Sequence, residues 1–477
     1  MLRRVTTPLE DRALLSLDAS RAEALEYATA IVSEAWRSFD AFRPDEPQVD
    51  AQLGALLREG LPGAPSPTVS VLADAARVLD SSLAQTRPRF FAFVGSSGLE
   101  IGVLGDLLAS CFDVNLATWA GAASELESQA VRWIADFVGF PAEEGAFTSG
   151  GTVSNMTALA AAREHALPGT RRRGLHGEGL TLYCSAESHY SVLRAAEVLG
   201  IGQEGVRSVP LDEGRRMDPA ALASMIDDDL AADAVPVAVV ATAGTTLTGA
   251  VDPIDAIADV CERRRVWLHV DGAYGLPAAA TASAGARFAG LDRADSVTLD
   301  AHKWLYLPKA CGVLLVRRRV DLETALAHEE DYIPHERPTA HMVDVTLEYS
   351  RPFRALKLWL AFRVHGADAF RAAIERNLRQ AKLLYEEVKR HADLEALCGP
   401  PQLSIVPFRH VPPGVDDLDA HNARLVRHLQ DDGRIWIAPA RVDGRIGLRP
   451  CIVNYRTTDD DVRALVELAR EFGNDVR

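Results

Sequence analysis

Short apolar runs alternate with helical patterns through the middle of the chain. The runs, several of them rich in β-branched residues, cover residues 180–184, 206–211, 235–241, 266–270, 296–299 and 312–316. Between some of these runs, apolar residues recur at helical spacing, at 191–199, 219–229 and 253–264. Apolar strands joined by crossover helices are typical of a mostly parallel sheet with both faces covered. The pattern therefore predicts a large α/β domain, whose ligands bind beyond the carboxyl ends of the strands.

The two ends of the chain have different patterns. Residues 1–85 carry helical periodicity, which a group of prolines at 62–67 interrupts. A long helical stretch begins near Ala355, and a final helix begins at Asp459. Between these helices lie alternating segments at 403–408, 435–438 and 446–454. We expect an N-terminal helical segment over residues 1–85, the large domain over 86–355 and a small α+β domain over 356–477.

Composition and charge narrow the possible partners and the compartment. The 477 residues include 51 basic and 67 acidic side chains, a formal net charge of −16, which disfavours nucleic acid and anionic membranes as partners. The sequence shows neither an apolar stretch that would span a bilayer nor the apolar core of a signal peptide, so we expect a cytoplasmic protein. The six cysteines form no C-x-x-C pair and no metal-ligand spacing, which indicates reduced thiols and no metal site.

Candidate catalytic side chains stand where a parallel sheet would place a ligand. His189, Asp271 and Lys303 each lie at or just beyond the carboxyl end of an apolar run. A turn of small residues at 148–152 opens a helical pattern, and the N–H groups at a helix N-terminus suit a phosphate. Thr246, which follows another run, adds a hydroxyl.

A lysine, a buried acid, a flat imidazole and a phosphate-binding turn are the groups that pyridoxal phosphate requires. The lysine forms a Schiff base with the cofactor, and the acid keeps the pyridine nitrogen protonated so that the ring can accept electrons. The imidazole can stack on the ring. Each signal is weak by itself, but their occurrence together and in this order on one sheet predicts a pyridoxal-phosphate enzyme.

Five motifs resemble those of the pyridoxal-phosphate-dependent group II amino-acid decarboxylases, which include aromatic-L-amino-acid, histidine and glutamate decarboxylases. The segment LDAHKWL at 299–305 is similar to the cofactor-lysine signature of that family. The other four motifs are RFFAF at 89–93, FTSGG at 147–151, HVDGAY at 269–274 and FRALK at 353–357. The resemblance follows the family's order over residues 85–475, so it implies the fold-type I architecture.

The resemblance also implies an assembly. Members of the family are obligate homodimers whose active sites lie between the subunits, and residues 1–85 would wrap the partner subunit. The partner in the active site would be a small-molecule substrate, an L-amino acid.

The roles of single residues follow from the matched motifs. Lys303 would carry the cofactor, Asp271 would pair with the pyridinium nitrogen, and His189 and Ala273 would sandwich the ring. The other implied cofactor contacts are Ser149, Gly150 and His302 near the phosphate, Thr246 near the phenolic oxygen, and Asp300, which replaces an asparagine found in some members.

One departure from the family's pattern lies in the loop before residue 353. Aromatic decarboxylases carry there a tyrosine that protonates the substrate carbon after CO2 has left. An ungapped count puts Met342 at that position, so the neighbouring His341 and the earlier Tyr332 become the candidate proton donors. The charged segment 328–348, interrupted by two prolines, is typical of a mobile lid.

The second departure lies in the implied substrate pocket, for which the candidate residues are Phe93, Ser96, Asn115 and Trp119. Asn115 stands where aromatic decarboxylases carry a larger apolar residue, and Ser96 stands where they carry threonine. These differences predict a roomier or more polar pocket.

The sequence thus favours a decarboxylase of an L-amino acid, with an aromatic substrate preferred, that releases CO2 and an amine. Three alternatives share the cofactor: an aldehyde synthase, an aminotransferase and a carbon–carbon lyase of the same fold. A further alternative is a non-catalytic binding protein that uses the same fold.

Overall fold

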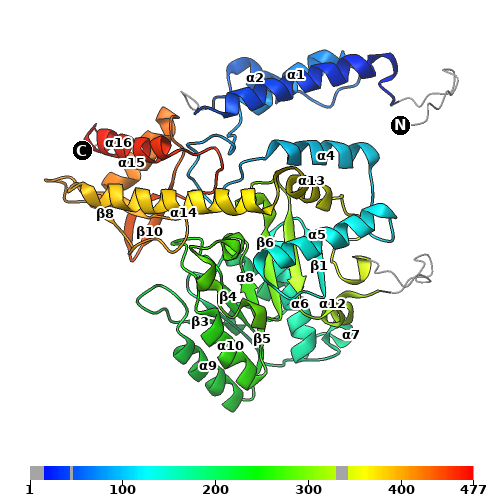
Figure 1. Cartoon of the computed structure of the whole chain (residues 1–477), viewed down its shortest axis with the longest axis vertical. Coiled ribbons are helices and arrows are strands. Elements are labelled where there is room, and N and C mark those ends of the chain that lie inside the picture. The colour runs from blue at the N-terminus through cyan, green and yellow to red at the C-terminus, as the bar shows by residue number, and fades with distance from the viewer. Residues whose placement is uncertain (1–14, 43–46, 329–341, 476–477) are drawn as a thin grey trace.

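The computed structural model describes residues 15–42, 47–328 and 342–475. Its centre is a sheet of seven strands in the spatial order β1-β7-β6-β5-β4-β2-β3 (Figure 1). The pairs β2–β3, β2–β4, β4–β5 and β5–β6 are parallel, whereas β7 is antiparallel to both β1 and β6. The predicted α/β fold with a mostly parallel sheet is confirmed. The strands are β1 (Glu144–Thr148), β2 (Leu180–Ser185), β3 (Val206–Val209), β4 (Val235–Thr242), β5 (Trp267–Asp271), β6 (Ser296–Asp300) and β7 (Gly312–Val316).

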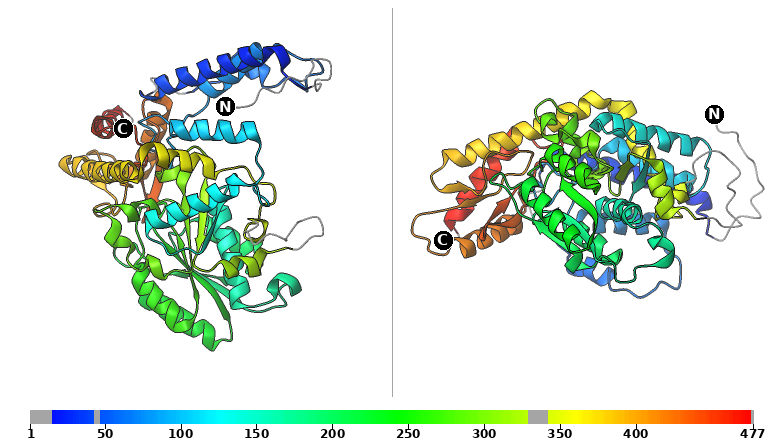
Figure 2. Two further views of the ribbon diagram at one scale, coloured as in Figure 1. Left: turned by 45° about the vertical axis from the view of Figure 1, so that its right-hand side comes forward. Right: turned by 90° about the horizontal axis from the view of Figure 1, so that it is seen from below.

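Helices cover both faces of this sheet, as the views in Figures 1 and 2 show. Side chains alternate along β4: Val240 packs in the cluster that includes α6 and α8, and Val239 packs in the cluster that includes α9 and α10. Burial on both faces explains why the strands read as continuous apolar runs. These helices are α5 (Ala122–Val138), α6 (Gly151–Ala166), α7 (Thr170–Arg173), α8 (Tyr190–Val198), α9 (Pro219–Ala231), α10 (Ile254–Arg264) and α12 (Arg319–Leu326).

Two elements differ from the sequence-based expectation. Strand β1 was not expected, because its sequence EGAFT is short and contains Gly145, where an added Cβ would stand 2.7 Å from the carbonyl oxygen of Leu314. The long helical stretch is in fact two helices, α13 (Ala355–His365) and α14 (Ala367–Arg390). Gly366 separates them with a φ of +76°, a backbone conformation that favours glycine.

The C-terminal part forms a second, smaller layer. Its four strands lie in the order β10-β11-β9-β8, all antiparallel. The expected segment 446–454 contains all of β11 except its first residue, whereas 403–408 and 435–438 each share one residue with an observed strand. Pro407 and Pro450 lack the N–H that a ladder needs, which partly explains these differences. The elements are β8 (Leu394–Ala396), β9 (Phe408–His410), α15 (Leu418–Asp432), β10 (Ala438–Val442), β11 (Arg445–Arg449) and α16 (Asp459–Asp475).

A strip of the N-terminal half, residues 86–93, is hydrogen-bonded to this smaller layer. The N–H of Phe91 donates to the carbonyl of Trp436 (2.8 Å), and the N–H of Cys451 donates to the carbonyl of Phe91 (2.9 Å). The guanidinium of Arg89 pairs with Asp461 at 2.8 Å. Residues 86–93 and the small layer, although distant in sequence, are therefore joined by backbone hydrogen bonds and an ion pair.

The N-terminal helices stand apart from the sheet. Helices α1 (Arg21–Phe39) and α2 (Ala51–Leu56) lie at one extremity of the molecule, α3 (Thr68–Asp80) packs on α1, and α4 (Glu100–Phe112) packs on α13 (Figures 1 and 2). Within the described ranges, none of the helices has the length and apolarity needed to cross a membrane.

Candidate active site

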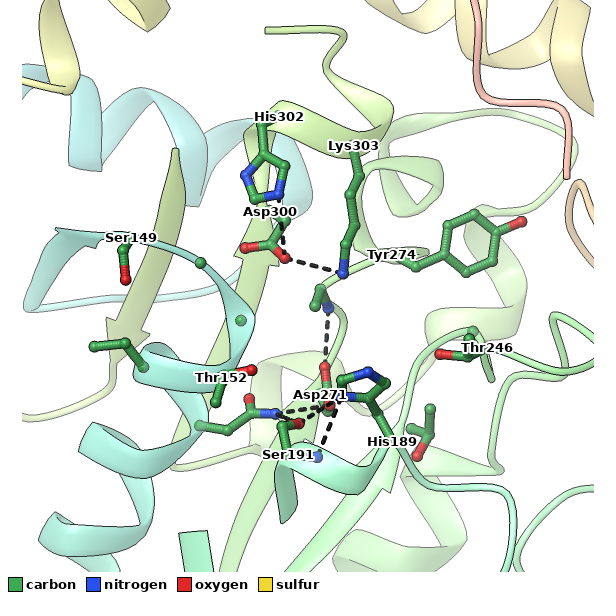
Figure 3. A pocket seen from close by; sticks show the side chains of 17 residues that line it. Ser149, Thr152, His189, Ser191, Thr246, Asp271, Tyr274, Asp300, His302 and Lys303 are labelled. Atoms are coloured by element: carbon green, nitrogen blue, oxygen red, sulfur yellow. Dashed lines mark hydrogen bonds and ion pairs between the residues drawn. The ribbon is translucent and has the colours of Figure 1, made fainter. Parts of the chain in front are cut away.

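A cavity of about 320 Å³ opens at the carboxyl ends of the parallel strands (Figure 3). Its wall is built by the segments that follow β1, β2, β4, β5 and β6, so the chain returns to it five times. This is the edge at which open α/β sheets bind ligands. The lining residues are Ser149, Gly150, Gly151, Thr152, Val153, Asn155, His189, Ser191, Thr242, Gly244, Thr246, Asp271, Ala273, Tyr274, Asp300, His302 and Lys303.

Lys303 enters the cavity from α11 (Ala301–Trp304), the short helix that directly follows β6 (Figure 3). Its Nζ lies 2.9 Å from Oδ2 of Asp300. Burial disfavours the charged ammonium, but the carboxylates of Asp300 and Asp271 outweigh that effect and raise the pKa of Lys303. In the protein by itself, Lys303 is therefore held as a cation.

Asp271 is the last residue of β5, on the opposite side of the cavity in Figure 3. Its Oδ1 accepts a hydrogen bond from the N–H of Ala273 (3.1 Å), and its Oδ2 accepts one from Nδ2 of Asn155 (2.8 Å). Each oxygen of this carboxylate is thus an acceptor of an N–H hydrogen bond from within the chain.

His189 precedes α8 and caps its N-terminus. Its Nδ1 lies 3.3 Å from the N–H of Ser191 and 2.9 Å from Oγ of the same residue. Burial lowers the pKa of His189, although the nearby Asp271 carboxylate opposes that shift. The ring beside Asp271 is therefore neutral at pH 7.

Ser149, Gly150 and Gly151 form the turn that starts α6. The first N–H groups of a helix lack partners within the helix, so this turn can bind an anion. A Cβ added at Gly151 would stand 2.9 Å from Cβ of Ala273 and 3.1 Å from Oδ2 of Asp300. Glycine at this position thus keeps the end of the cavity open.

His302 and Asp300 close the cavity beside that turn. Nδ1 of His302 accepts from the N–H of Cys311 (3.2 Å), and its Nε2 lies 3.8 Å from Oδ2 of Asp300. Burial lowers the pKa of His302, and the Asp300 carboxylate opposes that effect. Across the described part of the chain, Oδ1 of Asp300 is a buried oxygen without a hydrogen-bond partner.

Thr246 and Tyr274 form the wall nearest to the small C-terminal layer. The guanidinium of Arg449, in β11, donates to the carbonyl of Thr246 and to that of Phe93. The ring of Tyr274 stacks on Trp304 with centroids 5.2 Å apart. The two layers therefore meet at this wall.

A family model described as the pyridoxal-dependent decarboxylase conserved domain matches residues 51–411. The chain belongs to this decarboxylase family. It is 35% identical over 399 residues to an aromatic-L-amino-acid decarboxylase of Bacillus atrophaeus, with 82% of each chain covered. It is 33% identical over 425 residues to an L-2,4-diaminobutyrate decarboxylase of Rhizobium meliloti (strain 1021), covering 86% of this chain and 84% of the relative.

The structural comparison agrees with the family. A crystal structure of Oryza sativa TDC with PLP and tryptamine superposes with a TM-score of 0.91 at 27% identity, covering 98% of this chain and 99% of that one. The resemblance to group II decarboxylases and the fold-type I architecture are thus confirmed. The protein is an amino-acid carboxy-lyase whose cofactor is pyridoxal phosphate.

The cavity of the decarboxylase fits that cofactor. The open glycine turn suits a phosphate, and the neutral ring of His189 offers a flat face. The unpartnered Oδ1 of Asp300 and the buried cation of Lys303 are polar groups that a ligand can satisfy. All nine residues predicted to contact the cofactor line this one cavity.

The predicted substrate-pocket residues do not line the cavity of their own chain. Phe93 is 56% exposed, and Trp119 is half-buried. Oγ of Ser96 donates to the carbonyl of Leu307 (2.9 Å), and Oδ1 of Asn115 accepts from the N–H of Ala117 (3.0 Å). Their part in substrate binding stays a prediction.

The predicted loop donors, Tyr332 and His341, lie outside the described residues. Met342, which the ungapped count matched to the family's tyrosine, begins a 3-10 turn (Met342–Asp344). It is buried with Val345 in the cluster that includes α6 and α12. Residues 342–346 of the predicted lid are thus anchored to the large domain.

Asn155 and Ser191 are cavity residues that the sequence analysis missed. Neither belongs to a motif that the analysis singled out. The available signal was spacing: Asn155 stands four residues after Gly151 on the same helical face, and Ser191 stands two residues after His189. Among the described residues, no group of three or more His, Cys, Asp or Glu side chains could hold a metal ion.

Proposed function

We propose that this enzyme is a homodimeric decarboxylase of an aromatic L-amino acid, which it converts to CO2 and the corresponding amine. The convergence of Lys303, Asp271 and His189 on one cavity beside the N-terminus of α6 carries the proposal. Bound pyridoxal phosphate supplies the electron sink that takes up the electron pair left on the substrate's Cα when CO2 departs.

Lys303 would hold the cofactor covalently through Nζ. Asp271, fixed as an acceptor by its two N–H donors, would keep a proton on the ring nitrogen. His189 and Ala273 would flank the ring.

The other lining residues would fix the position of the cofactor. Ser149, Gly150 and His302 would contact the phosphate, and Thr246 would lie near the phenolic oxygen. Asp300 holds the proton on Lys303 in the free protein, because its Oδ2 lies 2.9 Å from Nζ and raises the pKa of the ammonium. Nζ must lose this proton before it can form a bond.

Borohydride reduction of the purified enzyme tests the assignment of Lys303. Reduction should fix the cofactor to the peptide that contains Lys303, and Lys303→Ala should abolish the visible absorption of the bound cofactor. A label on the peptide segment around Lys309 would contradict the assignment, provided that digestion separates the two lysines.

The relatives support the aromatic substrate class. The Bacillus atrophaeus relative is an aromatic-L-amino-acid decarboxylase, and the Oryza sativa structure holds tryptamine. The second candidate substrate is L-2,4-diaminobutyrate, the substrate named for the Rhizobium meliloti relative at nearly the same identity. A CO2-release screen over the common L-amino acids and diaminobutyrate decides between them. CO2 from diaminobutyrate alone would overturn the aromatic assignment.

Exposed apolar side chains support the homodimer. Leu104, Leu107, Leu108 and Phe112 share one face of α4 and are all exposed, as is Phe93. A second copy of this chain would cover such a face. It would also bring its predicted substrate-pocket residues, which do not line the cavity of their own chain, to the cavity of the first copy. Sedimentation should show a dimer. A fully active monomer would contradict the shared site.

A further inference from the structure

A continuous path of buried polar side chains leads away from Asp271 into the sheet. Nδ2 of Asn155, in α6, donates to Oδ2 of Asp271 (2.8 Å), and Oδ1 of Asn155 lies 3.0 Å from Nε2 of His269. Nδ1 of His269 lies 2.8 Å from Oγ of Ser296, which accepts from the indole N–H of Trp267 (3.0 Å). A buried path of this kind has a cost unless every group is paired, so the direction of each bond can be worked out.

The direction in which hydrogen bonds are donated along this path is fixed at both of its ends. The indole of Trp267 can only donate, and the ionised carboxylate of Asp271 can only accept. Asn155 must therefore turn its Nδ2 toward Asp271, which leaves Oδ1 facing His269 as an acceptor. Nε2 of His269 must then carry a hydrogen.

The remaining bonds follow from the neutrality of His269. Burial lowers the pKa of His269 to about 4, against the opposing charge of Asp271, so the ring carries one hydrogen at pH 7. With that hydrogen on Nε2, Nδ1 is the acceptor, and the hydroxyl of Ser296 donates to it. The oxygen of Thr298, 3.4 Å from Nε2, is a weaker second acceptor.

A branch of the same path reaches His189. The second hydrogen of Nδ2 in Asn155 points to Oγ of Ser191 (3.0 Å), so this oxygen is already an acceptor. Its own hydrogen then goes to Nδ1 of His189 (2.9 Å), which also accepts from the N–H of Ser191. The neutral ring of His189 must hold its hydrogen on Nε2.

We propose that Asn155 and His269 are positioning residues: the directional path that they complete orients the Asp271 carboxylate and places the single ring hydrogen of His189 on Nε2. The Nε2–H group is then the one hydrogen-bond donor that this ring can offer to a molecule in the cavity. Neither Asn155 nor His269 needs to touch the reacting atoms, and this inference rests on the proposed roles of Asp271 and His189.

Neutron diffraction tests the direction of the path without reference to activity. Deuterium should appear on Nε2 of both His189 and His269, and Nδ1 of both rings should be bare. Deuterium on Nδ1 of either ring would overturn the proposal, even if Lys303 proved to hold the cofactor as proposed.

Substitution of Asn155 tests its positioning role. Asn155→Leu leaves Asp271 and His269 without their common partner, and the apoprotein should bind pyridoxal phosphate about 10- to 100-fold more weakly, the effect of losing one hydrogen bond to a charged group. Asn422→Leu is the matched control, since Asn422 is equally buried and makes three hydrogen bonds far from the cavity. The control should lower the melting temperature but change cofactor affinity by less than about twofold. Equal affinity losses in the two variants would make the role of Asn155 merely structural and would overturn the proposal.

A pair of variants at His269 covers the case in which Asn155→Leu does not fold. His269→Gln can keep an N–H for Oδ1 of Asn155, whereas His269→Leu cannot. The glutamine variant should recover most of the cofactor affinity and of kcat that the leucine variant loses, with KM little changed in both. Glutamine and leucine variants that behave alike would contradict the proposal.

Discussion

Asp271 receives two N–H hydrogen bonds from within the chain, so its carboxylate is held before any ligand arrives. The hydrogen bonds of that carboxylate involve neither the turn at 149–151 nor Thr246. Asp271→Ala should therefore keep part of the cofactor affinity and lose kcat by about 10- to 100-fold, the scale of a lost hydrogen bond to a charged group. Stopped assays of CO2 release, with cofactor content measured from absorbance, check this. Undiminished turnover in a loaded variant would contradict the role of Asp271.

Asp300 controls the charge of Lys303. In Asp300→Asn, the nearer of the two carboxylates that raise the pKa of Lys303 is gone, while burial, which lowers that pKa, remains. The neutral amine is then present at lower pH. The rate at which apoprotein captures pyridoxal phosphate should reach its half-maximum at a lower pH than in the unchanged enzyme, as measured by the appearance of visible absorbance. A midpoint that stays in place or rises would contradict the inference that Asp300 holds the proton on Lys303.

The candidate site could be predicted in part from single residues. Lys303, Asp271 and His189 were predictable because each follows an apolar run at the carboxyl edge of a parallel sheet, and their contacts to the cavity are as expected. Asn155 was not, because an asparagine within a small-residue helix has no pattern that separates it from a neutral surface position. Its role depends on Asp271 and His269, which lie more than a hundred residues away in the chain.

At the scale of elements, the start of α6 determines the shape of the cavity where the phosphate of the cofactor would bind. Gly151→Ala would place a methyl group 2.9 Å from Cβ of Ala273 and 3.1 Å from Oδ2 of Asp300. The cofactor should bind at least about tenfold more weakly, a loss equivalent to roughly 1.4 kcal/mol, as measured by titration of the apoprotein. Gly399→Ala is the control, because an added Cβ there meets no atom within 4 Å. Unchanged affinity in Gly151→Ala would show that the turn does not hold the phosphate.

We propose that Tyr332 or His341 supplies the proton that decides between amine and aldehyde as the product. A positioned acid accelerates proton transfer by about 10²- to 10⁴-fold, so its loss would leave the substrate carbon exposed to dissolved oxygen after CO2 departs. We expect amine as the main product, with an aldehyde fraction that rises in His341→Phe or Tyr332→Phe. Product chromatography and an oxygen electrode measure both. Stoichiometric oxygen uptake by the unchanged enzyme would make it an aldehyde synthase.

Periodicity identified most elements of the sheet and failed where glycine or proline intervenes. The bounds of six strands of the central sheet differ by at most two residues from the bounds of the apolar runs, because strands buried on both faces need continuous apolar sequence. Strand β1 escaped notice because Gly145 lies against the backbone of β7 and has no side chain to contribute to the pattern. In the small layer, Pro407 and Pro450 divide what the alternation presents as longer strands.

At the scale of the whole molecule, the apolar face of α4 should control assembly. Leu108→Glu places a charge on that face, where the side chain is 47% exposed in the single chain. The dimer should dissociate at least about tenfold more readily in sedimentation, since burying an unpaired charge is unfavourable. Leu230→Glu is the matched control, because Leu230 is similarly exposed, at 44%, on the distant helix α9. Equal behaviour of the two variants would place the interface elsewhere.

The division into three parts was a prediction from composition and periodicity, which carry no record of contacts between distant segments. Residues 86–93 were placed at the start of the large domain. Their backbone and side chains bond to Trp436, Cys451 and Asp461 in the small layer. Only the three-dimensional arrangement could show this connection.

The pairing of residues 89–93 with the small layer determines the order in which parts of the chain can fold during synthesis. The RFFAF segment at 89–93 leaves the ribosome well before Trp436 and Cys451, which complete its backbone pairing, have been made. At about 5–20 residues per second, the segment waits roughly 20 to 70 s for those partners. The large domain can begin to form during this interval, but the small layer cannot close until residues 436–451 have been made. A nascent chain of this enzyme therefore carries an unpaired apolar segment throughout that interval, which is the kind of segment that holding chaperones bind.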